Sequence, residues 1–272
     1  VIRELLRVPV GVDTRLRRKS RWGGCSHPPP SSGKLIRVMG ASQGDTVWDS
    51  RARVAARALG WLAAFSISVA FWAPRVLFAW HPLCMSLAFL ALMTEGLLRA
   101  VDFRPLEKSA RVAAIQRHGL VQGAALVLLA AGYYAIYLNK ERLGKPHLTS
   151  YHSKFGLATA LLTVGSALGG VLSFRKLGLI EYVPEHLHAT IKGAHRKAGA
   201  ITWVLSLITI QLALTHQLVA AKGVMKPLWQ LSVLSLAVVG LALLAAKPRQ
   251  PPPLPYSAGH VTSPTTGSYK RV

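Results

Sequence analysis

The chain has 272 residues, of which 51% are hydrophobic and only 16% are charged, with a mean hydropathy of +0.34. Soluble proteins of this length rarely have such a composition, so an ordinary soluble domain is excluded and a membrane protein is favoured. A formal net charge of +23 would suit nucleic-acid binding. The basic residues lie in the tails and alternate loops, however, as membrane topology requires, so we expect no nucleic-acid partner.

The two ends of the chain differ from its middle. Residues 1–53 form a basic and polar N-terminal segment, in which Met39 opens a short polar stretch after an Arg-rich and Pro-rich region. One interpretation is that Met39 is the natural start and that residues 1–38 are not native. The other is an Arg-rich transit segment, which Glu4 and Asp13 disfavour. Residues 247–272 are polar and Pro-rich, and we expect a disordered tail.

Six segments between these ends are apolar enough to span a membrane, which takes about 20 mainly apolar residues per helix. They are roughly residues 54–73, 76–98, 112–138, 154–174, 197–220 and 228–246. None has the alternation of a strand, and the connections are short. We therefore predict an all-α polytopic membrane protein, with a six-helix bundle over residues 54–246.

The loops predict the orientation of the bundle. Lys and Arg are concentrated before the first helix, in the 2–3 and 4–5 loops and in the C-terminal tail. By the positive-inside rule both termini are cytosolic, as an even number of spans requires. We expect a multi-pass protein of an endomembrane, a vesicle membrane or the plasma membrane.

Four histidines lie near the starts of the second to fifth segments: His81, His118, His152 and His195. Consecutive spans run in opposite directions, so His81 and His152 are expected in a non-cytosolic layer and the other two in a cytosolic layer. Ionisable residues inside a membrane are costly and are functional by default. Two imidazoles at each of two depths would supply both axial ligands to two b-type haems, held in a four-helix core of helices 2–5.

Other histidines and nearby glycines leave alternatives. His188 precedes the fifth apolar segment and His216 would fall in the opposite layer at its far end, so we prefer His195 as the ligand. Gly156 and Gly199, each four residues after a layer histidine, either admit a flat macrocycle or allow close packing of helices.

A different class of function is a non-redox membrane carrier or scaffold whose histidines bind protons or metal ions. The sequence lacks the paired carboxylates and broken helices of a carrier. It also has no local His/Cys spacing for a tight zinc site. Cys25 and Cys84 are not expected to pair, and Cys84 is expected to be a packing residue.

Four blocks of sequence resemble the cytochrome b561 family of transmembrane reductases, especially its branch of cytochrome b561 domain-containing proteins. They are WHPLCMSLAFLALMTE around His81, RHGLVQ around His118, LGKPHLTSYHSKFG around His152 and His-x-x-x-Gly at His195, within a resemblance over about residues 54–246. It implies two haems b, one held by His81 and His152 and the other by His118 and His195. It also implies a homodimer and places the family's helix 2 glutamate at Glu95.

The resemblance further implies cytosolic ascorbate as electron donor and monodehydroascorbate or a ferric chelate as acceptor. Ascorbate is an anion near neutral pH, and a group of basic residues on the cytosolic side would attract it. This group, the cytosolic basic cluster, comprises Arg111, Arg117, Lys192, Arg196 and Lys197. His147, on the other side, is either a contact for the acceptor or a solvated loop residue. The two charges directly after His195 depart from the family pattern and place it close to the interface.

Overall fold

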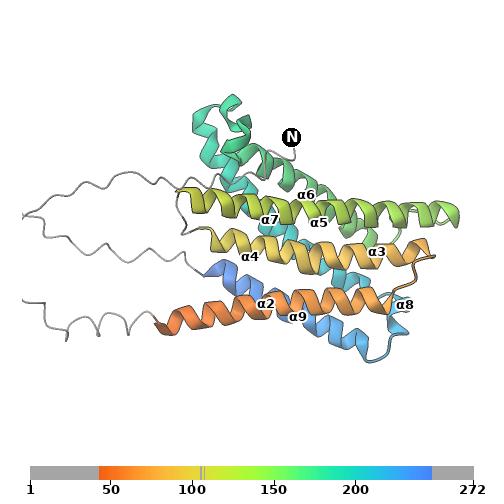
Figure 1. The fold of residues 1–272 in the computed structure, drawn as a ribbon. Coiled ribbons are helices and arrows are strands. Elements are labelled where there is room, and N and C mark those ends of the chain that lie inside the picture. The colour runs from red at the N-terminus through yellow and green to blue at the C-terminus, as the bar shows by residue number, and fades with distance from the viewer. Residues whose placement is uncertain (1–42, 105, 107, 247–272) are drawn as a thin grey trace, which may run out of the picture. The chain divides into compact units, whose positions relative to one another are not determined.

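The computed structural model describes residues 43–104, 106 and 108–246, and within these residues all regular structure is helical and no strand occurs (Figure 1). Six of the described helices are long and apolar enough to cross a membrane. The predicted all-α, six-span architecture is therefore confirmed. All six spans belong to one compact unit that begins at Asp45. The expectations for residues 1–42, with Cys25 and Met39, and for the tail 247–272 lie outside the described residues.

The second span differs from the others because it is built from three consecutive pieces. Its middle piece, η2, is a π-helical segment between two α-helical pieces, α3 and α4. The elements in chain order are α2 (Gln43–Ala70), α3 (Leu77–Ser86), η2 (Leu87–Met93), α4 (Thr94–Asp102), α5 (Lys108–Arg142), α6 (Tyr151–Ser173), the 3-10 turns η3 (Arg175–Leu177) and η4 (Leu179–Tyr182), α7 (Glu185–Ala213), α8 (Gln217–Ala220) and α9 (Met225–Ala245).

The ends of the helices follow local sequence signals. At the start of α6 the Ser150 hydroxyl accepts from the Ser153 N–H, and the Ser153 hydroxyl accepts from the Ser150 N–H, which is a capping box. The range predicted for the fifth span, 197–220, is wrong at both ends. Helix α7 starts at Glu185, directly after Pro184, so it includes polar turns that precede the apolar run. It ends at Ala213, so His216 lies outside it and instead caps α8.

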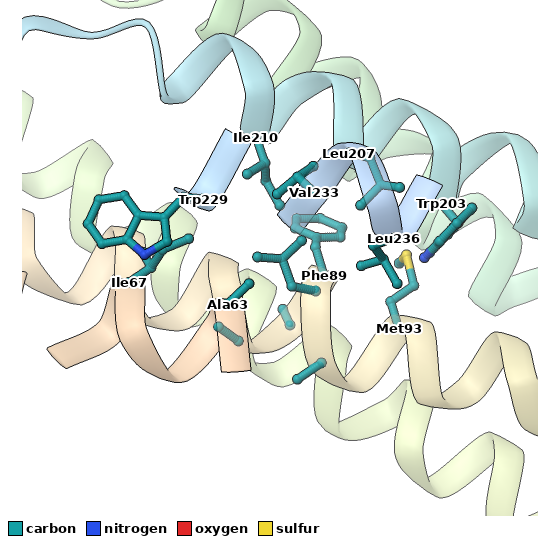
Figure 2. Packing of buried hydrophobic residues seen from close by; sticks show 14 of the residues in the cluster. Ala63, Ile67, Phe89, Met93, Trp203, Leu207, Ile210, Trp229, Val233 and Leu236 are labelled. Atoms are coloured by element: carbon teal, nitrogen blue, oxygen red, sulfur yellow. The ribbon is translucent and has the colours of Figure 1, made fainter. Parts of the chain in front are cut away.

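A buried hydrophobic cluster lies where the first, second, fifth and sixth spans meet. Side chains of α2, η2, α7 and α9 interdigitate there (Figure 2). The labelled members are Ala63, Ile67, Phe89, Met93, Trp203, Leu207, Ile210, Trp229, Val233 and Leu236. Two glycines allow the closest approaches. A Cβ on Gly60 of α2 would collide with the Leu90 carbonyl oxygen, and one on Gly240 of α9 would collide with the Trp203 indole.

Candidate functional site

The four layer histidines meet in two pairs inside the bundle. His81 of α3 faces His152 of α6, with ring centroids 6.0 Å apart and an interplanar angle of 77°. His118 of α5 faces His195 of α7, at 6.4 Å and 82°. The structure thus pairs the histidines that were expected to share a layer because consecutive helices run in opposite directions.

Each of these histidines also binds a backbone carbonyl on a neighbouring helix through Nδ1. A carbonyl oxygen only accepts, so Nδ1 carries the hydrogen and Nε2 is left as the ring atom with a free lone pair. Metal-bound histidines typically have this arrangement, because the second hydrogen bond fixes the tautomer and the ring orientation. For His81, His118, His152 and His195 the acceptors are Gly132, Gly96, Thr209 and Ser166, at 3.1, 2.8, 3.0 and 2.9 Å.

Three other described histidines have different hydrogen bonds. His188 donates from Nε2 to the Val183 carbonyl at 2.8 Å. The Nδ1 atom of His216 accepts from the Leu218 N–H at 3.3 Å. His147 bonds through Nε2 to a carboxylate. These arrangements favour His195 over both alternatives in its part of the chain, because only His195 combines a histidine partner with an Nδ1–carbonyl bond.

The hydrogen bonds are reciprocal between adjacent spans. The second and third spans exchange them, since His81 donates to α5 and His118 donates to α4. Helices α6 and α7 do the same with His152 and His195. Each of these four spans therefore supplies a histidine to one layer and a carbonyl to the other. In α5, α6 and α7 the carbonyl comes fourteen residues after the histidine, or about 21 Å of helix.

Glycines make room for this arrangement at specific positions. A Cβ on Gly170 would lie only 3.0 Å from Cε1 of His195, so a side chain there would press on the imidazole. A Cβ on Gly132 would lie 2.9 Å from Cβ of Cys84, which is buried and acts as a packing residue as expected. Gly156 and Gly199 face the partner helix, with ordinary contacts of 3.7 and 3.6 Å for an added Cβ.

A network of ion pairs adjoins the His118 and His195 pair. The Arg57 guanidinium of α2 binds Glu95 at 2.7 Å and Asp102 at 3.0 Å. Arg99 also binds Glu95 at 2.8 Å, and Arg53 binds Asp102 at 2.9 Å. The Glu95 side chain is only 13% exposed and directly precedes the Gly96 carbonyl that accepts from His118.

The sequence interpretation missed this network. It treated the arginines of α2 as topology signals, and it assigned Glu95 only as the family's helix 2 glutamate, without a partner. The available signal was an arginine inside the first apolar segment together with an acid inside the second. Charges at such depth are usually paired with one another.

The five residues predicted to form the cytosolic basic cluster lie at the start of α5 and along the first turns of α7. Odd-numbered spans start on the same side of a bundle, so the cluster shares its side with the His118 and His195 pair. Its side chains are exposed except for that of Lys192, which is half-buried. An anion arriving from solvent would therefore meet these charges before it reached the histidines.

His147 lies in the exposed loop between α5 and α6, on the side of the His81 and His152 pair. Its Nε2 is 2.8 Å from a carboxylate oxygen of Glu141. Its ring stacks on Tyr137 with centroids 4.9 Å apart and an interplanar angle of 26°. The loop histidine thus has a defined position, and its contact with an acceptor stays a prediction.

Fold and site together define a class: a six-span membrane protein with paired histidines at two depths. Residues 80–221 match the family described as eukaryotic cytochrome b561. The chain is 34% identical over 173 residues to the transmembrane reductase CYB561D2 of Bos taurus, covering 62% of this chain and 74% of that protein. It is 27% identical over 185 residues to the transmembrane ascorbate-dependent reductase CYB561 of Sus scrofa, covering 68% and 70%.

A third relative, the probable transmembrane reductase CYB561D1 of Mus musculus, is 31% identical over 142 residues, covering 51% of this chain and 59% of that protein. The chain therefore belongs to the cytochrome b561 family. It is a cytochrome b561-type transmembrane reductase, an integral multi-pass membrane protein with haem as its cofactor.

Proposed function

We propose that the chain holds two haems b, one between His81 and His152 and the other between His118 and His195. The centroid distances support this assignment. A metal bonded at about 2 Å to each of two imidazoles puts their ring centroids roughly 6 Å apart, and the two pairs measure 6.0 and 6.4 Å. The free Nε2 atoms support it as well, because the Nδ1 atoms are already engaged.

The protein's contribution is to fix the ligands. Haem b, when bound through two histidines, supplies reversible one-electron chemistry at a six-coordinate iron rather than oxygen chemistry. The Nδ1–carbonyl bonds fix each ring and make each imidazole a stronger ligand. Each of the four core spans carries a histidine in one layer and a carbonyl in the other. The same four helices therefore orient the ligands of both haems.

The donor in this proposal is ascorbate on the cytosolic side, which is also the side of both termini. Ascorbate loses one electron and one proton and becomes monodehydroascorbate, with the proton released to water. The cytosolic basic cluster raises the local concentration of the anion. The name of the relative CYB561 of Sus scrofa, an ascorbate-dependent reductase, supports this choice of donor.

The acceptor is monodehydroascorbate or a ferric chelate on the opposite side, near His147. It gains the one electron that ascorbate lost: ferric iron becomes ferrous, or monodehydroascorbate takes up the electron and a proton from water and becomes ascorbate. We also propose the domain boundaries 1–53, 54–246 and 247–272, and a homodimer within the bilayer. The observation that carries the proposal is the double pairing of the four histidines.

The test is the haem content of full-length protein purified in detergent. We expect two haems b per chain, both reduced by ascorbate, in a reduced-minus-oxidised absorbance spectrum. A carrier or scaffold would show no haem spectrum, and a haem-to-chain ratio near zero would refute the proposal.

A further inference from the structure

The second span has one residue more between its histidine and its carbonyl than the other three core spans. Gly96 is the fifteenth residue after His81, whereas the spacing is fourteen in α5, α6 and α7. In a regular α-helix one added residue turns everything beyond it by about 100° and advances it by about 1.5 Å. The Gly96 carbonyl would then point away from His118.

The π-helical segment η2 lies between these two residues and absorbs the difference. A π turn takes up one extra residue while the helix on either side keeps its phase. Thr94, directly after the segment, gives separate evidence for the wide turn: its hydroxyl donates to the carbonyl of Phe89, five residues earlier, at 3.4 Å. Four other buried threonines donate to the carbonyl four residues earlier at 2.7–2.8 Å: Thr159, Thr163, Thr202 and Thr209.

Residues of two neighbouring spans, α2 and α7, contact this turn. The Leu90 carbonyl approaches α2 where only Gly60 leaves room for it. From α7, the Trp203 indole donates to the Thr94 hydroxyl at 3.0 Å, and the Trp203 side chain is fully buried. Figure 2 shows Trp203 beside Met93, with Phe89 in the same cluster. The turn is therefore held from two sides, at Leu90 and at Thr94, and Thr94 lies two residues before Gly96, whose carbonyl binds His118.

We propose that η2 is a register-preserving turn in the second span. It absorbs the extra residue, so that His81 serves one pair while the Gly96 carbonyl stays aligned with His118 of the other pair. Thr94 and Trp203 are positioning residues, which act through the turn on the orientation of the His118 imidazole. The inference rests on the proposed haem ligation by the two pairs.

Two single-residue deletions test the register. Removing Leu92, a half-buried residue of η2, should convert the segment to regular α-helix with the fourteen-residue spacing of the other spans. The purified variant should keep two haems per chain. Removing Val127 of α5, which is 68% exposed and lies between His118 and Gly132, shifts a regular helix and should reduce the content to one haem or none.

The outcomes separate this inference from the proposed function. If the unaltered protein has two haems and the Leu92 deletion loses haem or fails to fold, the register explanation is wrong. Two haems retained in the Val127 deletion would also overturn it, because register would then not matter. No haem in the unaltered protein would refute the proposed function instead.

Substitutions of Thr94 test the positioning role. Thr94→Val removes the hydroxyl bonded to Phe89 and Trp203 but keeps the shape, so it should shift the midpoint potential of the His118 and His195 haem alone. Thr94→Ser keeps the hydroxyl and should retain the original potential. Unchanged potentials in Thr94→Val, or equal shifts of both haems, would contradict the positioning role, since a purely structural residue would alter stability without this selectivity.

Discussion

Gly170 tests whether the position of the His195 ring controls one haem alone. An alanine Cβ at residue 170 would lie 3.0 Å from Cε1, 3.5 Å from Nδ1 and 3.6 Å from Nε2 of His195. The ring must therefore move by a few tenths of an ångström. Overpacking of this kind costs about 1–3 kcal/mol, and the helix propensity that alanine gains over glycine is the same with and without haem.

The adjacent glycine provides a matched control. A Cβ on Gly169 would lie 3.7 Å from Cβ of His195, which is ordinary contact, so Gly169→Ala should gain helix propensity and disturb nothing. We expect Gly170→Ala to weaken the haem of the His118 and His195 pair by about tenfold and to leave the other haem intact, since a net cost near 1.4 kcal/mol is tenfold in affinity.

The assay is haem loss during dilution or competition with a haem-binding protein, followed in the reduced-minus-oxidised spectrum of each variant. The reasoning would be refuted if Gly169→Ala lost as much haem as Gly170→Ala. It would equally be refuted if Gly170→Ala released the haem of the His81 and His152 pair first.

Two further predictions concern charge. Arg117→Ala and Lys192→Ala should slow reduction by cytosolic ascorbate in sided vesicles without loss of haem, and the effect should fade as salt rises because exposed charges are screened over about 8–10 Å. Arg142→Ala, on the opposite side, should leave the stopped-flow rate unchanged, and equal slowing by all three would disprove steering. Arg57→Ala should lower the free energy of unfolding by about 1–3 kcal/mol, because it removes the shared partner of two carboxylates. Adding Glu95→Gln should restore part of that loss in a thermal melt, and an additive loss would argue against the pairing.

The six spans and the two histidine layers could be predicted because both depend on side chains: the length of each apolar segment and the positions of the four histidines. The apolar segments could not show that α7 begins at Glu185, because polar residues can continue a helix outside the membrane as readily as they can end it. The reciprocal bonds could not be read from sequence either, because backbone carbonyls such as that of Thr209 have no residue-specific signature.

Ion pairs between residues far apart in the sequence could not be predicted either. Arg57 and Glu95 are 38 residues apart, and each has an ordinary explanation alone. The π turn gives no compositional signal, since LAFLALM suits a regular α-helix equally well. It becomes visible in the structure, from the spacing of fifteen residues in the second span against fourteen in the others and from the Thr94 bond to a carbonyl five residues earlier.

Single replacements of the four histidines test the central claim most directly. In the reduced-minus-oxidised spectrum of protein purified in detergent, His81→Ala and His152→Ala should each remove one and the same haem component. His118→Ala and His195→Ala should each remove the other component. Loss of a common component in His81→Ala and His118→Ala, or full retention of both haems in all four variants, would contradict the account.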